Sequence, residues 1–110
     1  MKTQLNRGLE RRLMYVENKV GAIDGVRGRI GWASFSRTGR TVYYRHLVLA
    51  RLKGGGVSGN YFDEATGDEY WISGVKARGS NAHWAERTDI AVDADALEAY
   101  EALRAGAPPA

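Results

Sequence analysis

The chain has 110 residues, of which 44% are apolar and 26% charged, a size and composition typical of one folded domain. It contains no Cys, which excludes a disulfide framework, thiolate zinc sites and cysteine nucleophiles. Its longest aliphatic run covers only residues 47–50, far short of the ~20 apolar residues that span a bilayer, and no apolar leader follows the first charges. We therefore expect a cytoplasmic protein that does not enter a membrane.

The net charge of +3 is divided unevenly along the chain. Residues 1–53 carry 12 basic and 3 acidic side chains, a net charge of +9, whereas residues 54–110 carry 4 basic and 10 acidic ones, a net charge of −6. This asymmetry indicates either a basic surface for an anionic partner or two halves that attract each other in the fold.

The first residues are expected to form an N-terminal extension, 1–13, ahead of a single β-rich domain at 14–106 and a disordered tail at 107–110. Within the extension, Leu5, Leu9 and Leu13 recur every four residues, a spacing that fits a short helix over 2–13. Gly8 weakens that helix, so a loose leader is the alternative. Residues 13–17 then begin the β-type pattern as the first strand.

After a glycine-rich loop at 21–28, the pattern predicts a β-hairpin with strands at 29–36 and 41–45. The segment between them ends in Gly39, which suits a type I turn with the glycine in the left-handed conformation. Dense apolar residues continue through 47–52, and we expect one long strand that bends near His46.

A flexible glycine-rich connection at 53–60 leads into a second hairpin, with strands at 61–63 and 69–73 around a Thr-Gly turn. A loop follows at 74–82. Residues 83–87 and 89–92 are expected to supply one last strand or two short ones.

The chain ends in a predicted helix that Asp93 or Asp95 caps. Its apolar stripe should dock on the sheet, because a helix this short is marginal alone. Gly106 suits the position that follows the helix, and two prolines prevent its continuation. The stripe consists of Leu97, Tyr100 and Leu103.

Short strands without β-α-β alternation argue against a parallel doubly wound sheet. The predicted fold class is mainly β, within the α+β class. We expect a small, strongly bent antiparallel sheet or an SH3-like barrel with the C-terminal helix at its side.

Four segments resemble a family of small bacterial proteins of unassigned activity: residues 29–31, 35–45, 60–63 and 66–74. The resemblance covers roughly residues 14–103, and Tyr-Trp-Ile-Ser-Gly at 70–74 is its most specific stretch. Members sometimes carry the label 1-deoxy-D-xylulose-5-phosphate synthase. A chain of 110 residues cannot enclose thiamine diphosphate and its metal, so the resemblance implies a compact cytosolic protein and no synthase activity.

Catalytic and metal-binding patterns are weak in this sequence. The two histidines, His46 and His83, are isolated, so we expect no metal site. No serine lies in a Gly-x-Ser-x-Gly elbow. The glycines at 54–59 follow Lys53 and precede a strand, unlike a phosphate-binding loop. The acid pairs of the second hairpin are expected to stabilise its turn. We therefore expect neither a cofactor nor enzymatic activity.

The strongest functional candidate is a set of basic and aromatic residues around the first hairpin. Cations that bind phosphates and exposed rings that stack on bases are the combination used by nucleic-acid-binding barrels. The competing interpretation is a packed core with a solvated rim, in which Arg37 and Arg40 pair with acids of 64–69. The predicted binding residues are Arg29, Arg37, Arg40, Tyr43 and Arg45, with Trp32 as a further member of the set.

We therefore expect a small intracellular binding module whose partner is nucleic acid or an acidic protein. The alternative is a protein–protein inhibitor or immunity-type protein without catalytic activity, which charge steers to its target. A small enzyme is the third alternative. Since open sheet edges invite pairing, residues 47–49 also predict a homodimer through an edge strand.

Overall fold

The computed structural model of the chain describes residues 9–53, 59–79, 81 and 90–106. Within these ranges the backbone forms seven strands, one 3-10 helix and one α-helix. In chain order they are β1 (Glu10–Asn18), β2 (Gly28–Phe35), β3 (Thr41–Tyr44), β4 (Leu47–Arg51), β5 (Tyr61–Asp63), β6 (Glu69–Gly74), β7 (Ile90–Val92), η2 (Ala94–Ala96) and α1 (Leu97–Arg104).

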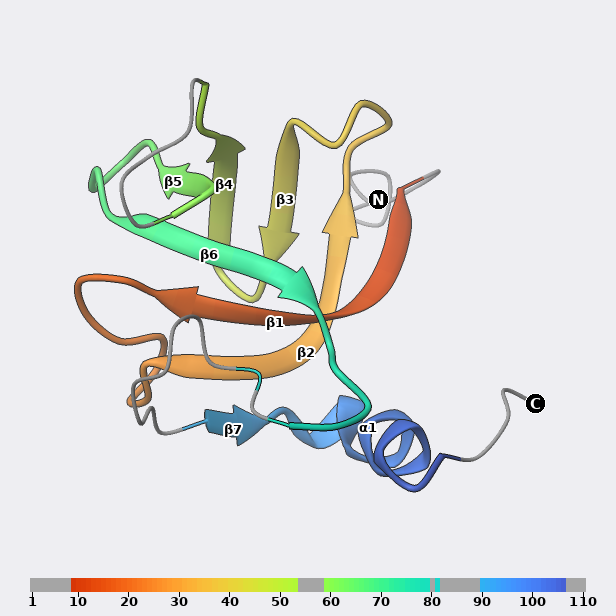
Figure 1. Cartoon of the computed structure of the whole chain (residues 1–110). Helices are drawn as coiled ribbons and strands as arrows, with labels where there is room; N and C mark the ends of the chain where they lie inside the picture. Colours follow the sequence, from red (N-terminus) through yellow and green to blue (C-terminus); the bar gives the residue numbers. More distant parts are fainter. Residues whose placement is uncertain (1–8, 54–58, 80, 82–89, 107–110) are drawn as a thin grey trace.

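Six of these strands close into an antiparallel barrel (Figure 1). Each of β2 to β5 pairs with the next strand along the chain, and β1 pairs with both β2 and β6, which closes the sheet on itself. β7 adds to the outside of β2 in parallel. The mainly β class is thus confirmed, as a small barrel of the SH3-like kind with a short C-terminal helix.

The barrel interior is filled by alternate residues of the strands, as the period of two in a half-buried sheet requires. In β3, Val42 and Tyr44 are buried while Tyr43 between them is 38% exposed. Large aromatic and aliphatic side chains from every barrel strand meet in this core. They are Val16, Ile23, Ala33, Phe35, Val42, Tyr44, Leu47, Leu49, Tyr61, Tyr70 and Ile72.

The other face of β1 is buried as well. Tyr15 and Glu17 lie on the opposite side of the strand from the core residue Val16, and both are at most 1% exposed. Tyr15 donates a hydrogen bond of 2.5 Å to Glu17, whose other oxygen lies 2.5 Å from Nζ of the buried Lys19. Both faces of β1 are therefore buried in its C-terminal half, at residues 15–18.

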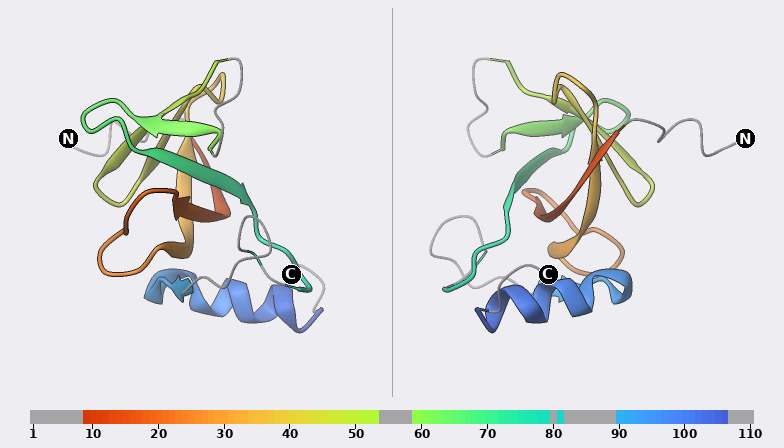
Figure 2. Two further views of the ribbon diagram at one scale, coloured as in Figure 1. Left: turned by 60° about the vertical axis from the view of Figure 1, so that its left-hand side comes forward. Right: turned by 90° about the vertical axis from the view of Figure 1, so that its right-hand side faces the viewer.

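The C-terminal segment is attached to β2 by hydrogen bonds. The backbone N–H of Asp93 donates to the Ile30 carbonyl at 2.8 Å, and the Trp32 indole donates to the Asp95 carbonyl at 3.1 Å. Ala96 of η2 is fully buried. β7 and the helices thereby lie at the end of the molecule opposite the β2–β3 turn (Figure 1, Figure 2).

Two expected elements differ from the structure near the N-terminus and in the middle of the chain. Residues 10–13 are strand, because β1 begins at Glu10 and pairs along eight residues of β2, so the predicted helix is wrong there. The long strand through 41–52 is also wrong. Arg45 adopts a positive φ of 53° and reverses the chain, which makes β3 and β4 a tight antiparallel hairpin.

This hairpin places β4 inside the sheet rather than at its edge. β4 pairs with β3 along Leu47–Ala50, and with β5 only at residues 49–51. The homodimer through an edge strand stays a prediction.

The predicted C-terminal helix exists but docks differently. No residue of α1 is buried, and Leu97, the first member of the expected stripe, is 44% exposed. The far end of α1 is tied to a loop instead, because Arg104 donates to the carbonyls of Lys76 and Gly79. The buried anchor is the preceding turn of η2.

The predicted turn glycines are confirmed. Gly39, Gly67 and Gly106 have φ of 75°, 82° and 74°, the left-handed region that favours glycine. The strands expected at 61–63 and 69–73 form, and β7 covers part of 89–92. The expectations for 1–8, 54–58, 83–87 and 107–110 lie outside the described residues. In the described part of the chain, no helix is long and apolar enough to cross a membrane.

Candidate functional site

A row of small and aromatic side chains crosses the outer face of three neighbouring strands. The strand register places Thr41 of β3 opposite Ala50 of β4, and Ala50 opposite Phe62 of β5. Directly opposed residues in antiparallel strands project to the same face. Because Thr41 and Ala50 are short, the row leaves a depression beside the Phe62 ring.

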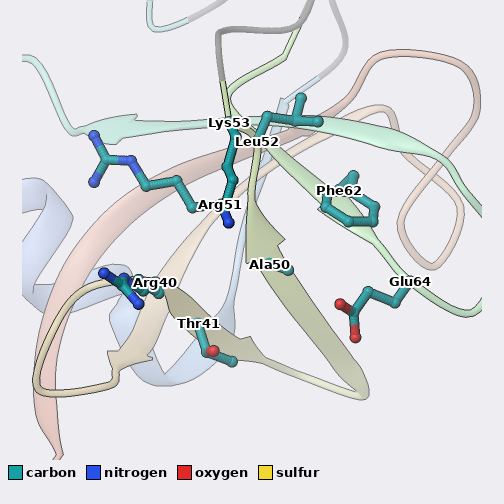
Figure 3. Close-up of a pocket in the computed structure, with 8 residues that line it drawn as sticks. All are labelled: Arg40, Thr41, Ala50, Arg51, Leu52, Lys53, Phe62 and Glu64. Atoms are coloured by element: carbon teal, nitrogen blue, oxygen red, sulfur yellow. The ribbon is translucent and has the colours of Figure 1, made fainter.

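This depression is an open groove of about 750 Å³ (Figure 3). Arg40, Arg51 and Lys53 line one side, whereas Phe62 and Glu64 stand on the other. The groove therefore has a cationic wall, and a half-buried aromatic ring and a carboxylate opposite the cations. The described residues that line it are Arg40, Thr41, Ala50, Arg51, Leu52, Lys53, Phe62 and Glu64.

A second hollow, of about 330 Å³, shares Arg51 with the groove and continues it over the mouth of the barrel. Arg37 of the β2–β3 turn lies in its lining, and so does Arg12 of β1. The Arg12 guanidinium stacks 4.7 Å from the centre of the Phe35 ring and pairs with Glu10 at 2.7 Å. Arg12 is thus neutralised, whereas Arg37 adds to the charge around Arg51.

We call Arg37, Arg40, Arg51 and Lys53 the basic rim. All four are exposed, and among the described residues none of them has a carboxylate within 4 Å. Backbone pairing holds two of them together, since the Arg51 N–H donates to the Arg40 carbonyl at 2.8 Å. Like charges held in this way produce a local positive potential that attracts anions.

The expected pairing of the first hairpin's arginines with acids of the second hairpin does not occur. Asp63 instead accepts a hydrogen bond from the Ala65 N–H within its own turn. Asp68 lies at 3.5 Å from the Asn18 amide. Glu69 accepts from the Gly59 N–H at 3.0 Å. Asp63 thus stabilises its turn, as predicted, whereas Asp68 and Glu69 contact β1 and the segment before β5. None of the three pairs with the basic rim.

Arg29 and Arg45, by contrast, are paired with carboxylates of the chain itself. Arg29 contacts Asp93 at 3.0 Å and donates to the Ile23 and Asp24 carbonyls, and its side chain is 14% exposed. Arg45 pairs with Asp24 at 2.6 Å and with Asp93 at 3.1 Å. The prediction that these two arginines contribute to a binding surface has no support in their geometry.

Asp93, which pairs with both arginines, is buried at the end of the barrel next to β7 and η2, the lower end in Figure 1. Tyr44 donates to its second carboxylate oxygen at 2.5 Å. Burial, together with this hydrogen bond, raises the pKa of the Tyr44 hydroxyl above its ordinary value. A Cβ at Gly31 would lie 2.1 Å from the same oxygen, so only glycine leaves room for the carboxylate.

We call Asp24, Arg29, Tyr44, Arg45 and Asp93 the Asp93 cluster. It lies at the opposite end of β3 from the basic rim, because Arg40 precedes that strand and Arg45 follows it. The four arginines among the predicted binding residues are thus divided between the two ends of the hairpin.

The remaining predicted residue, Tyr43, projects outward beside Val48, its cross-strand partner, which is 53% exposed. Both lie on the same strands as the groove without lining it. Sequence reasoning missed Arg51, Lys53 and Phe62, which belong to later segments. Only the strand register brings them next to Arg40.

The two histidines were the remaining candidates for a metal site. His46 is exposed, and its Nδ1 lies 3.7 Å from Asp24. His83 lies outside the described residues. In the ranges that the structure describes, no three His, Cys, Asp or Glu side chains gather as metal ligands.

The comparisons with known proteins identify no relative. No protein-family model matches the chain, and neither a curated protein nor a solved structure matches it at a significant level. The resemblance to the family of small bacterial proteins stays a prediction.

Proposed function

We propose that this protein is a non-enzymatic binding module that holds a nucleic-acid strand across the basic rim. The observation that carries the proposal is the set of four exposed cations that no carboxylate among the described residues neutralises. Phosphate oxygens are the natural partners of such a set, since Arg and Lys supply most protein contacts to nucleic-acid backbones. The proposal includes the cytoplasmic location expected from the sequence.

The distribution of charge over the molecule supports this proposal. At the lower end of the barrel, Asp24 and Asp93 neutralise Arg29 and Arg45. At the upper end, the basic rim keeps its charge. An approaching polyanion therefore meets one attractive end, which orients it and raises its rate of association.

A salt titration tests the proposal. We expect a fluorescein-labelled oligonucleotide to bind at low salt, followed by fluorescence anisotropy. For a single strand that contacts all four cations, log K should fall with log salt at a slope of about −3. No binding at low salt would contradict the proposal.

The double variant Arg40→Ala/Arg51→Ala assigns the surface. Each lost phosphate contact should reduce the magnitude of the salt slope by about 0.7. Lys76→Ala/Arg78→Ala is the matched control, since it also removes two positive charges and both residues are exposed and lie outside both hollows. An equal effect of the control and of the double variant would mean that net charge alone drives binding.

A protein partner is the second candidate, and the exposed pair Tyr43 and Val48 favours it. Tyrosine is enriched in protein interfaces, and two adjacent exposed apolar side chains on rigid strands suit one. In that case the chain should capture one protein from nuclease-treated native lysate, and Tyr43→Ala/Val48→Ser should lose it. A partner that disappears with nuclease treatment would return the choice to nucleic acid.

A further inference from the structure

We infer that the groove beside Phe62 receives one unpaired base of a single-stranded nucleic acid, with the flanking phosphates on Arg40, Arg51 and Lys53. This inference rests on the proposed function and adds the kind of strand and the position of the base. It follows from the arrangement of chemical groups around the groove: cations on one side, and a ring and a carboxylate on the other (Figure 3).

The two walls of the groove set the direction in which a nucleotide lies. Glu64 repels phosphate, whereas Arg40, Arg51 and Lys53 attract it. The sugar–phosphate backbone therefore follows the cationic wall, and the base points across the short side chains of Thr41 and Ala50.

Phe62 supplies the surface for the base. The ring is half-buried and lines the groove from β5, a strand paired on both sides. A ring held on a paired strand loses little freedom when a base stacks on it. The volume of about 750 Å³ lies within the range of pockets that take small ligands.

Stacking on Phe62 requires a base whose face is uncovered. In a duplex both faces of each base are covered by neighbours, so only an unpaired or extruded base can reach the ring. The groove therefore favours single strands over duplexes, although the basic rim attracts the phosphates of both.

Glu64 adds a preference among the bases. An ionised carboxylate only accepts hydrogen bonds, so it favours a base with an exocyclic amino group. Cytosine carries such a donor. The N3–H donor of an unpaired thymine lies between two carbonyl oxygens, which repel a carboxylate. We expect oligo-dC to bind more tightly than oligo-dT of the same length.

The first test measures binding of labelled oligo-dC of about 10 nucleotides to the full chain by anisotropy. Phe62→Ala should weaken binding about 5- to 100-fold and leave the salt slope unchanged. Phe62→Leu keeps an apolar side chain of similar size but has no ring, so it should also weaken binding. Loss of binding in this variant therefore reports the loss of stacking rather than a folding defect. Val48→Ala, on the same face outside the groove, is the control, and circular dichroism confirms that each variant is folded.

The second test uses Glu64→Gln with oligo-dC and oligo-dT. The glutamine amide both donates and accepts, so the preference for oligo-dC should fall to about one. Glu101→Gln on α1 also removes one negative charge from an exposed position and should retain the preference. Equal binding of the two oligonucleotides by the unmodified protein would contradict the role of Glu64.

The outcomes separate this inference from the proposed function. If the unmodified protein binds no oligonucleotide, both fail. A second outcome is binding with the expected salt slope, in which Phe62→Leu binds as well as the unmodified protein and a duplex competes as well as a single strand. In that case the basic rim binds phosphates, and the inference of a base site beside Phe62 is wrong.

Discussion

Gly31 shows how one residue connects the barrel with the C-terminal segment. Its missing side chain admits the Asp93 carboxylate, which in turn contacts Tyr44, Arg29 and Arg45. The sequence pattern places Gly31 inside a strand, where glycine often marks a close approach of another group. The identity of that group depends on a contact with a residue 62 positions later in the chain.

We predict that Gly31→Ala destabilises the protein. The new methyl group must displace the Asp93 carboxylate or the Tyr44 ring, and overpacking of this kind costs about 1–3 kcal/mol. Urea unfolding measures the change in the free energy of unfolding. Gly74→Ala is the control, since a Cβ there meets no atom within 4 Å. Equal effects of the two substitutions would contradict the packing seen at Gly31.

A second prediction concerns acid stability. The hydrogen bond from Arg45 lowers the pKa of Asp24, and the neighbouring His46 and Arg29 act in the same direction. Since the pKa of the folded state lies below the unfolded value of about 3.9, the carboxylate stabilises the fold above that pH. This stabilisation is lost as the pH falls through the folded value. Asp24→Asn should therefore be less stable than the unmodified chain at pH ~7, and the difference should shrink towards pH ~2.

Urea unfolding at several pH values measures this difference. Asparagine tolerates the positive φ of 46° at this position, so the backbone is not strained. Glu101→Gln controls for the loss of one negative charge. A difference that is the same at both ends of the pH range would mean that the Arg45 pair does not carry it.

At the level of elements, local chemistry predicted some strands well. The hairpin at 61–63 and 69–74 follows from alternation and from the turn at Gly67, both of which are local. The turn at Arg45 was missed, because an arginine with positive φ carries no turn signal in the sequence. Its conformation depends on Asp24 and Asp93, which are distant in the chain and hold the guanidinium.

The candidate site was predicted in part. Arg37 and Arg40 stand out in the sequence as a basic turn, and both belong to the basic rim. Phe62 reads in the sequence as an ordinary strand residue. Its place beside Arg40 arises only when β5 pairs with β4, a register that no local pattern specifies.

The C-terminal segment supplies a third prediction, because Asp93 fastens it to the barrel. Asp93→Ala leaves Arg29 buried without its carboxylate, and loss of one member of a buried pair costs about 3 kcal/mol or more. Tyr44→Phe removes only a hydroxyl and should cost less, about 1 kcal/mol. Denaturant unfolding measures both values. In Asp93→Ala, hydrogen exchange should show that the amides of β7 lose protection before those of β3. If Asp93→Ala is as stable as the unmodified chain, Asp93 does not have this role.

Considered as a whole, the molecule separates its tyrosines into buried and exposed groups. Burial raises the pKa of Tyr15, Tyr44 and Tyr70, helped by the acids Glu17, Asp93 and Asp68 respectively. Their folded pKa values thus exceed the unfolded value of about 10. They stabilise the fold fully below that pH, and this stabilisation is lost as the pH rises above it.

We predict that absorbance at 295 nm will show these tyrosines ionising only as the barrel unfolds in alkali. Far-ultraviolet circular dichroism, recorded in parallel, should report unfolding over the same pH range. Tyr15→Phe should reduce this late absorbance change by about a third, since it removes one of the three phenols whose pKa is raised. Ionisation of all tyrosines before any loss of dichroism would contradict the buried arrangement.

The seam between β1 and β6 has a consequence for the chain during synthesis. It pairs Met14–Asn18 with Tyr70–Gly74, so a ribosome must release most of the polypeptide before the circle can be completed. Until then, the edge of β1 that pairs with β6 lacks its hydrogen-bond partners. The loss of chain entropy on bringing distant segments together slows closure of the barrel. The nascent chain thus passes through an interval in which proteases and chaperones can still reach its interior.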